Sequence, residues 1–304
     1  MQRTIVDNYT LRERMDIIDK EYGLDSIHVQ CEALKVARGT YLNHRLHNKN
    51  DTAWFKRREA EYTEIITRIH EESGHVYGPK KITAIMHKQG KPVSDRYVRK
   101  LMIENGLSSV RSPFNKNYAY VSRHLREASH ASQDFKVDRI NQVWVSDTSA
   151  IYIHGRYYYI CVYIDLFSRK VVGWGLGRSN STQLVKRTFQ KAFKARKNPK
   201  NLIIHTDNGM CYSSYSLNRL FQKLKLTHSY SRVGIPHDNA VAESFYNTLK
   251  REAIYLEGSP VSYRDLEKRI SSYIDRYNTI RPHEHLNYDS PDDFEKKHAK
   301  KAQK

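Results

Sequence analysis

Three acidic residues, Asp147, Asp207 and Glu243, have the types and positions that metal-dependent chemistry needs. Carboxylate oxygens are hard ligands, and Mg²⁺ prefers them to the histidine and cysteine ligands of other metal sites. Two divalent ions about 4 Å apart can activate a nucleophile and stabilise a leaving oxygen during phosphoryl transfer. We therefore treat these residues as candidate ligands for divalent metal ions.

The first two candidates lie on expected strands. Asp147 lies near the end of its strand, where alternating side chains put it on the same face as Val143 and Val145. A carboxylate on such a core-facing stripe is costly unless it is paired or binds a metal ion. Asp207 follows the apolar run LIIHT at the carboxyl end of another strand, where open sheets build their sites. The two carboxylates meet if these strands are neighbours.

The third candidate lies on a helix that is expected to start at Asp238, which we interpret as its cap. The buried stripe of this helix, at four-residue intervals, is Val241, Phe245 and Leu249. Glu243 lies on another face, from which it can approach the sheet. A further carboxylate, Glu252, is interpreted as part of a solvated helix end.

Polar side chains near these carboxylates are candidate contacts for a polyanion. Lys250 and Arg251, about two helical turns after Glu243, are placed to reach a phosphate, and Asn239 lies on the same face as Glu243. His205, two residues before the second aspartate, is either a further ligand or a structural histidine.

The charge of the whole chain indicates the same kind of partner. Its 304 residues carry 52 Lys and Arg against 33 Asp and Glu, which gives a formal net charge of +19 and a pI near 9.7. Such an excess of basic residues is typical of nucleic-acid-binding proteins. A basic protein of the membrane surface would also carry an amphipathic helix with an exposed apolar face or a lipidation signal, and the sequence shows neither.

Targeting and cysteine signals are also missing from the sequence. The N-terminus has no signal-peptide run, and no segment approaches the roughly 20 apolar residues of a membrane span. The three cysteines lie far apart without CxxC spacing, which supports neither a disulfide framework nor a cysteine-based zinc module. We expect a cytoplasmic protein with reduced thiols and no membrane partner.

Residues 1–50 are expected to form a helical unit. A short helix opened by Ser26, a turn near Gly39 and a second helix carrying Tyr41 and Arg45 give the outline of a helix-turn-helix. Arg45 is the candidate DNA contact of this unit. The alternative is a small helical hairpin that does not touch DNA.

Residues 51–108 are expected to form a second helix-turn-helix, the DNA-binding domain. Pro79 fits the first turn of one helix, and Ser94 caps the next. The apolar residues that face inward from this last helix are Val98, Leu101 and Met102. Its outward basic residues, the candidate major-groove contacts, are Arg96, Arg99 and Lys100.

The rest of the chain divides into a basic linker (109–138), an α/β core with C-terminal helices (139–295) and a basic tail (296–304). Three β-branched and aromatic segments joined by short turns predict an antiparallel meander at the start of the core. Alternating helices and strands follow. The expected architecture is a mixed five-stranded sheet with flanking helices, preceded by all-α modules.

Three segments of the core resemble the signature blocks of DDE transposases in the retroviral-integrase superfamily: WVSDTSAIYI, IIHTDNGMCYSS and PHDNAVAESFYNTLKRE. The 35 residues between Asp207 and Glu243 belong to the same pattern. The sequence resembles in particular the bacterial insertion-sequence family called IS-three, in its second-frame product. The C-terminal block and the helix-turn-helix of that family resemble YNTIRPHEHLNYDSPDDF and YGPKKITAIMHKQGKPVSDRYVRKLMIENGL. The resemblance covers nearly the whole chain.

The resemblance implies an RNase H-like core whose metal-binding acids are Asp147, Asp207 and Glu243, with two Mg²⁺ ions or Mn²⁺ as a substitute. It implies binding to the terminal inverted repeats of an insertion sequence and to target DNA, cleavage of the 3′ ends, and strand transfer. Because two DNA ends must be brought together, a homo-oligomer, at least a dimer, is expected on DNA. The expected location is the bacterial cytoplasm, at the nucleoid.

Two other functions remain open. Residues 148–150 and 210–211, beside the first two aspartates, depart from the family pattern, and a core that no longer reacts would leave a DNA-binding regulator. A nuclease that acts on RNA·DNA hybrids would explain the carboxylates but not the two helical modules. Incubation of labelled element ends with Mg²⁺ separates the transposase from the regulator.

Overall fold

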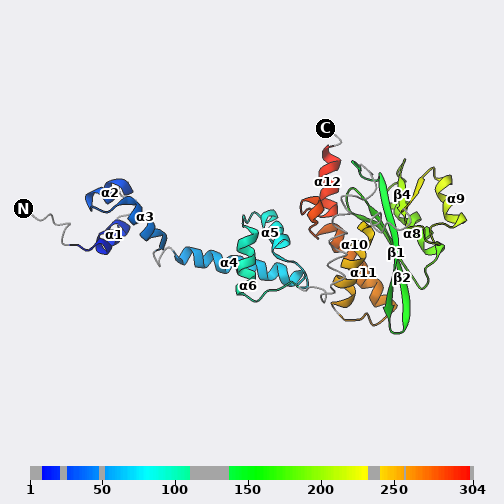
Figure 1. Cartoon of the computed structure of the whole chain (residues 1–304), viewed down its shortest axis with the longest axis horizontal. Helices are drawn as coiled ribbons and strands as arrows, with labels where there is room; N and C mark the ends of the chain where they lie inside the picture. Colours follow the sequence, from blue (N-terminus) through cyan, green and yellow to red (C-terminus); the bar gives the residue numbers. More distant parts are fainter. Residues whose placement is uncertain are drawn as a thin grey trace, which may run out of the picture.

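The computed structural model describes residues 9–20, 26–47, 52–109, 137–231, 240–256 and 258–301. Figure 1 shows three groups of elements: a small set of helices, a long helix that leads into a second helical unit, and a sheet flanked by helices. Nearly all of the expected linker, together with Asp238 and Asn239, lies outside the described residues. Within the described ranges, no helix is long and apolar enough to cross a membrane.

The first unit consists of α1 (Leu11–Lys20), α2 (Ile27–Ala33) and α3 (Arg38–His47). Ser26 caps α2 as expected, because its side chain accepts a hydrogen bond from an amide of the first turn. The prediction of a turn near Gly39 is wrong. The chain turns earlier, where Lys35 adopts a left-handed conformation with φ 50° and closes α2, so Gly39 lies inside α3. The core of this unit is Met15, Ile18, Cys31, Val36 and Tyr41.

The second unit consists of α4 (Thr52–Glu72), α5 (Pro79–Lys88) and α6 (Asp95–Glu104). Pro79 is the first residue of α5, and the Ser94 hydroxyl accepts a hydrogen bond from the amide of Tyr97 at 3.2 Å, so both predicted helix starts are confirmed. The predicted inward residues of α6, namely Val98, Leu101 and Met102, are buried against residues of α4 and α5. Helices α5 and α6 form the helix-turn-helix.

The third unit is built on β1 (Val143–Ile153), β2 (Arg156–Asp165), β3 (Val171–Gly177), β4 (Ile203–Thr206) and β5 (Thr227–Tyr230). The strands lie in the order β3-β2-β1-β4-β5. The first three strands pair antiparallel as a meander, whereas β1 with β4 and β4 with β5 pair in parallel. The predicted mixed five-stranded sheet is therefore confirmed.

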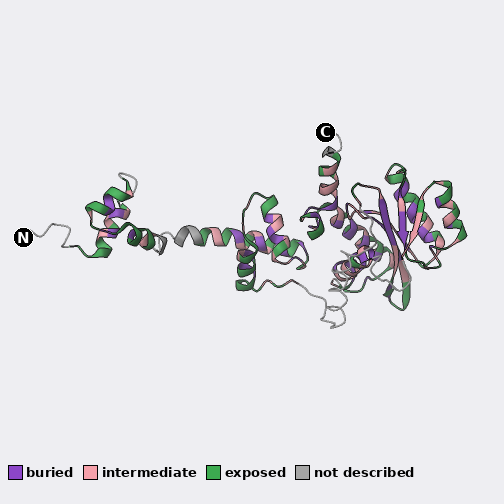
Figure 2. Ribbon diagram, turned by 45° about the horizontal axis from the view of Figure 1, so that its top comes forward, coloured by how far each residue is buried: buried purple, intermediate pink, exposed green. Residues whose placement is uncertain are grey.

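Helices cover both faces of this sheet. One face carries α8 (Thr182–Ala195) and α9 (Tyr215–Lys223), and the other carries α10 (Ala240–Leu249), the π-helix η3 (Lys250–Tyr255) and α11 (Tyr263–Thr279). Neighbouring residues of β2 enter opposite cores, since Tyr163 packs with Phe189 of α8 and Val162 with Phe245 of α10. Figure 2 shows the buried residues gathered along the strands and the inner sides of these helices.

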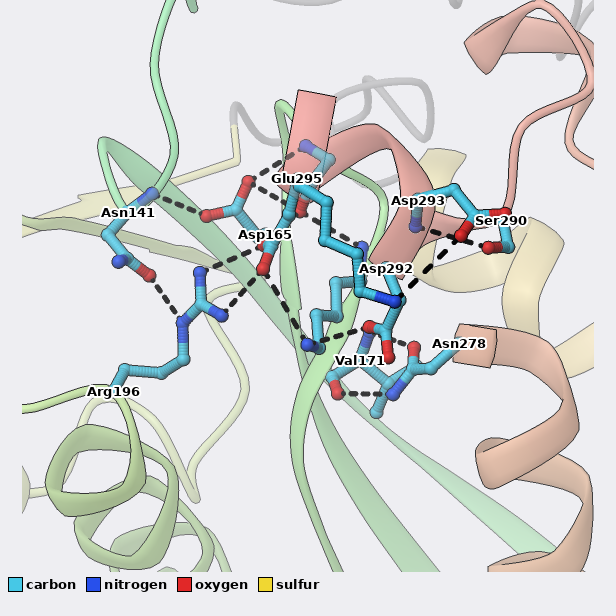
Figure 3. Close-up of polar contacts among 12 residues, drawn as sticks. Asn141, Asp165, Val171, Arg196, Asn278, Ser290, Asp292, Asp293 and Glu295 are labelled. Carbon is cyan, nitrogen blue, oxygen red and sulfur yellow. Dashed lines mark hydrogen bonds and ion pairs between the residues drawn. The ribbon is translucent and has the colours of Figure 1, made fainter. Parts of the chain in front are cut away.

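The last two elements are η4 (Glu284–Leu286) and α12 (Pro291–Lys301), and ion pairs attach α12 to the core. Glu295 of α12 accepts hydrogen bonds from both terminal nitrogens of Arg196 at 2.9 Å, as Figure 3 shows. Lys170, beside β3, pairs with Asp292 at 2.7 Å. The C-terminal helix is thus fixed to α8 and to the sheet, and it continues to Lys301, inside the range expected to be a basic tail.

Candidate active site

Asp147 and Asp207 lie next to each other where β1 and β4 run in parallel. Ser146 of β1 pairs with Thr206, the last residue of β4, so the two aspartates occupy the next position on each strand. The condition for the two carboxylates to meet, that their strands are neighbours, is therefore fulfilled. Asp147 is not near the end of its strand, however, because the antiparallel pairing with β2 carries β1 on to Ile153.

The side chain of Tyr246 fixes α10 over the first aspartate. Its buried hydroxyl donates to the backbone carbonyl oxygen of Asp147 and lies 3.1 Å from that of Ile160. Glu243 precedes Tyr246 by three residues, which is a neighbouring position on the same side of a helix. The contact that holds α10 on the sheet therefore also directs Glu243 toward Asp147.

The pKa of Asp147 is shifted by its burial and by the charged residues around it. Burial raises the pKa of the Asp147 carboxyl to about 7, although the hydrogen bond from the Thr148 amide lowers it. The negative charges of Asp207 and Glu243 raise this pKa further, and the positive charge of Lys250 lowers it. Asp207 and Glu243 are thus each close enough to Asp147 to repel its negative charge.

The loop after β4 is shaped around the Asp207 carboxylate. The amide of Gly209 donates to Asp207 Oδ1 at 3.2 Å, and a Cβ atom at Gly209 would lie 3.1 Å from the same oxygen. Any larger residue would crowd the carboxylate. The hydroxyls of buried Tyr212 and of Ser146 lie 2.9 Å apart, which ties this loop to β1 beside Asp147.

Lys250 is the first residue of η3, the π-helix that continues α10. π-Helices are rare and often mark functional sites. Burial lowers the pKa of the half-buried Lys250 ammonium, and the charge of Asp147 opposes this effect. Lys250 therefore faces the carboxylates. The next residue, Arg251, instead pairs with Glu252 at 3.1 Å.

Glu252 does not lie at a solvated helix end as expected. It is 4% exposed, and Arg281 donates to its two carboxylate oxygens at 2.8 and 3.2 Å. Burial raises the pKa of Glu252, but the charge and hydrogen bonds of Arg281 outweigh burial and hold it at about 2. This buried ion pair explains the residue without a catalytic role.

The candidate DNA contacts of the helical modules lie outside the core. Arg96, Arg99 and Lys100 are exposed on α6, where Lys100 also pairs with Glu104 at 3.6 Å. Arg45 is partly exposed on α3. The candidate His205 is buried, and its two ring nitrogens lie 3.1 and 3.2 Å from serine hydroxyls, which favours the structural interpretation.

Sequence reasoning missed the roles of Tyr246, Tyr212 and Arg281. Tyr246 lies three residues after Glu243, and this spacing is the one signal that marks it as a partner of the site. Nothing in the local sequence connects Tyr212 with Ser146, or Arg281 with Glu252, because both contacts depend on tertiary packing.

Replacing Tyr246 with Phe removes the buried hydroxyl that donates to the backbone carbonyl oxygen of Asp147 and contacts that of Ile160. We expect a loss of about 1–3 kcal/mol in the free energy of unfolding. Denaturant unfolding measures this loss. Tyr255→Phe is the matched control, because Tyr255 is exposed, and it should leave stability unchanged. Equal stability of the two variants would contradict the anchoring role of Tyr246.

Family comparisons agree with this geometry. Residues 137–236 and 224–291 match two families described as integrase core domain, and residues 56–114 match an HTH-like domain. The catalytic core domain of HTLV-2 integrase, solved in complex with magnesium, aligns with a TM-score of 0.43 at 18% identity, over 51% of this chain and 96% of that one. The two integrase core matches and the five-stranded sheet with helices on both faces define an RNase H-like DDE polynucleotidyl transferase, a class of enzyme that uses divalent metal ions.

Comparison with curated relatives identifies the family within this class of enzyme. The transposase for insertion sequence element IS904 of Lactococcus lactis is 37% identical over 75% of this chain and 90% of its own length. The transposase InsF for insertion sequence IS3A of Escherichia coli is 30% identical over 92% of this chain and 97% of its own length. The chain belongs to the insertion-sequence transposases of the IS-three family, which carry out DNA transposition.

Proposed function

We propose that this chain binds the terminal inverted repeats of an insertion sequence, cleaves the 3′ ends and transfers them to target DNA. The observation that supports this most directly is the convergence of three carboxylates from β1, the end of β4 and α10. Asp207 and Glu243 lie close enough to Asp147 to raise its pKa. A catalytic role for these three residues follows from their position and from the chemistry of the family.

The chemistry of the donor set fits divalent cations. All donors are carboxylate oxygens, and a cation would relieve their mutual repulsion. Among the described residues, one group brings its ligand atoms within 4.8 Å of one another, and it is Asp16, Asp19 and His44 in the first unit. The active-site acids are spaced more widely. Asp147, Asp207 and Glu243 would hold two divalent ions, which would supply the charge that a reacting phosphodiester needs. We assign Mg²⁺, with Mn²⁺ as a substitute.

Bound ions would activate the attacking oxygen and stabilise the leaving oxygen of the phosphodiester. The residues of this chain hold the geometry. The Thr148 amide donates to the Asp147 carboxylate at 2.7 Å, and Tyr246 fixes the helix that carries Glu243. Lys250 supplies positive charge where a substrate phosphate would lie. Hydrolysis frees a 3′-hydroxyl, which the same site then directs at a second phosphate without a covalent protein intermediate.

DNA recognition is assigned mainly to α6. Its exposed Arg96, Arg99 and Lys100 are the proposed major-groove contacts. Further proposed contacts are Arg45, Asn239 and Arg251. Because two element ends must be held together, the working form on DNA is at least a dimer. The reaction takes place in the bacterial cytoplasm, at the nucleoid.

The test is incubation of the purified chain with labelled element ends, Mg²⁺ and a target duplex. We expect 3′-end cleavage and joined products, and neither product with a chelator present. A duplex of unrelated sequence is the control for end recognition. Salt-sensitive binding without any cleavage would contradict the proposal and leave a DNA-binding regulator.

Stabilisation by Mg²⁺ should depend on pH. The pKa of Asp147 is raised from 3.8 to about 7 without metal, so a proton occupies this carboxyl at pH 6 and is lost by pH 8. A cation must displace the proton at the lower pH, which weakens its binding. We expect Mg²⁺ to raise the melting temperature more at pH 8 than at pH 6. This difference should vanish in Asp147→Asn, and equal shifts in the unmodified chain would contradict the assignment.

A further inference from the structure

The helix-turn-helix touches the C-terminal part of the core through one helix. Lys80 of α5 pairs with Glu284 of η4 at 3.2 Å. Lys88, at the other end of α5, lies 3.2 Å from Asp289 and 3.4 Å from Asp293. The two lysines are eight residues apart, which places them on one side of the helix. Basic side chains of α5 therefore meet acidic side chains along the length of this helix.

The centre of this contact is buried. Lys81, beside Lys80, lies near Arg281 and Glu252, and its ammonium lies 5.0 Å from the centroid of the Tyr77 ring. Burial, and next the charge of Arg281, lower the pKa of Lys81 to about 7 against the opposing charge of Glu252. Tyr77 itself is 5% exposed. Side chains of the helix-turn-helix and of the core, both shielded from water, are thus in contact around Lys81.

The buried centre distinguishes this contact from chance surface pairing. Exposed ion pairs contribute about 0–1 kcal/mol each, and two or three of them would not define an interface. Lys81 is partly buried there, and removing the charge of a lysine from water is costly unless a partner is present. The Lys81 environment needs both surfaces, since Tyr77 comes from one unit and Arg281 with Glu252 from the other.

The acidic side of the contact is itself held in place. Asp289 also pairs with Lys297 at 2.6 Å, and Figure 3 shows α12 attached to the core through Asp292 and Glu295. Glu252 is locked by Arg281. A preformed surface loses little freedom when a partner docks on it.

We propose that Glu252, Arg281 and the acidic residues Glu284, Asp289 and Asp293 form a docking surface for the helix-turn-helix of the same chain. Helix α5 is the docked element, and its lysines are interdomain contacts rather than DNA contacts. Helix α6 keeps Arg96 and Arg99 exposed. The DNA sequence that α6 reads then lies at a fixed distance from the carboxylates. This last consequence rests on the proposed function, whereas docking does not.

Zero-length carbodiimide cross-linking of the full chain tests docking without DNA or catalysis. The reagent joins a lysine to a carboxylate only where the two are in contact. Between the two units we expect two cross-linked peptide pairs by mass spectrometry, Lys80 with Glu284 and Lys88 with Asp289 or Asp293. Lys81→Glu places a carboxylate beside Glu252, and both products should be lost. Lys81→Met removes only the charge of a residue that is already easily deprotonated, and both products should remain.

Two controls separate undocking from misfolding or from a general charge effect. Lys91 pairs with Glu61 inside the helix-turn-helix, so their cross-link should survive in Lys81→Glu if the module stays folded. Arg99→Glu makes the same change of charge on α6 and should keep all the cross-links. Undiminished Lys80 and Lys88 products in Lys81→Glu would overturn the proposal.

A mixture of ¹⁴N- and ¹⁵N-labelled chains shows whether docking is within one chain. We expect both ends of each cross-linked pair to carry the same label, and pairs of mixed label as the main product would overturn docking in cis. The cross-links should also persist when terminal-repeat DNA is bound. Their loss on DNA binding would show that α5 exchanges its acidic partners for phosphates. If the chain fails to cleave DNA at all, the DNA-free arm still decides whether the module docks.

Discussion

Glu243→Gln should reduce end cleavage and strand transfer by roughly a thousandfold or more, because a neutral amide replaces a carboxylate that supports several kcal/mol of transition-state stabilisation. The side chain keeps its shape, so α10 should remain packed through Phe245 and Tyr246. Affinity for terminal-repeat DNA should stay nearly unchanged, since the proposed reader α6 is untouched. Quantified cleavage products and a gel-shift titration measure the two effects.

Glu267→Gln is the matched control for this substitution. Glu267 is exposed on α11, and the same chemical change there should leave cleavage intact. Mg²⁺-dependent cleavage by Glu243→Gln at the normal rate would remove Glu243 from the active site. A parallel loss of DNA affinity would mean that the substitution acts on binding instead.

Arg281→Met should be among the most destabilising single changes in the core. It removes both hydrogen bonds that Arg281 donates to the buried Glu252 carboxylate, which keeps its contact with Arg251, and breaking a buried pair typically costs about 3–5 kcal/mol. Thermal and denaturant unfolding at pH 7 measure the loss. The pKa of Glu252 is lowered from 4.5 to about 2, so the stability from its charged form is present above pH 4.5 and is lost as the pH falls toward 2.

The double variant Glu252→Gln/Arg281→Met separates two contributions to the free energy of unfolding: the stabilisation that the ion pair provides, and the cost of a buried charge that has lost its partner. Replacing both members of a buried pair with neutral groups often costs little, so the double variant should regain much of the stability that Arg281→Met loses. A double variant less stable than Arg281→Met would show that the pair stabilises the fold through both of its charges. Full stability of Arg281→Met alone would contradict the burial of this contact.

Helix starts and strands could be predicted from short sequence patterns because the interactions that form them involve residues close together in the sequence. Ser26 and Ser94 satisfy free amides of the next turn, which a short sequence window contains. Alternating side chains along β1 and β2 likewise reveal strands whose two faces enter different cores. Gly39 misled the same reasoning, because a glycine signals a turn in sequence but can also be accommodated inside a helix.

The three acids could be proposed from sequence because Asp147 lies within a recognisable strand, Asp207 follows another, and Glu243 lies on an amphipathic helix. The side chains that surround these acids could not be predicted in the same way. Glu252 lies at what resembles an exposed helix end, and only the packing of Arg281, 29 residues later in the chain, reverses that interpretation. Tyr246 lies on a helix face whose neighbours are known only once α10 is placed over β1.

For the proposed active site, the parallel pairing of β1 with β4 also sets when a newly made chain can become active. The two strands are far apart in the sequence, so a long loop must close before their hydrogen bonds and packing can stabilise the chain. Closing such a loop is a slow step in folding. Glu243 leaves the ribosome later still and reaches Asp147 only when α10 packs on the finished sheet. The helix-turn-helix precedes both and folds from contacts that are close in sequence. A partly synthesised transposase can therefore attach to DNA before it is able to cut it.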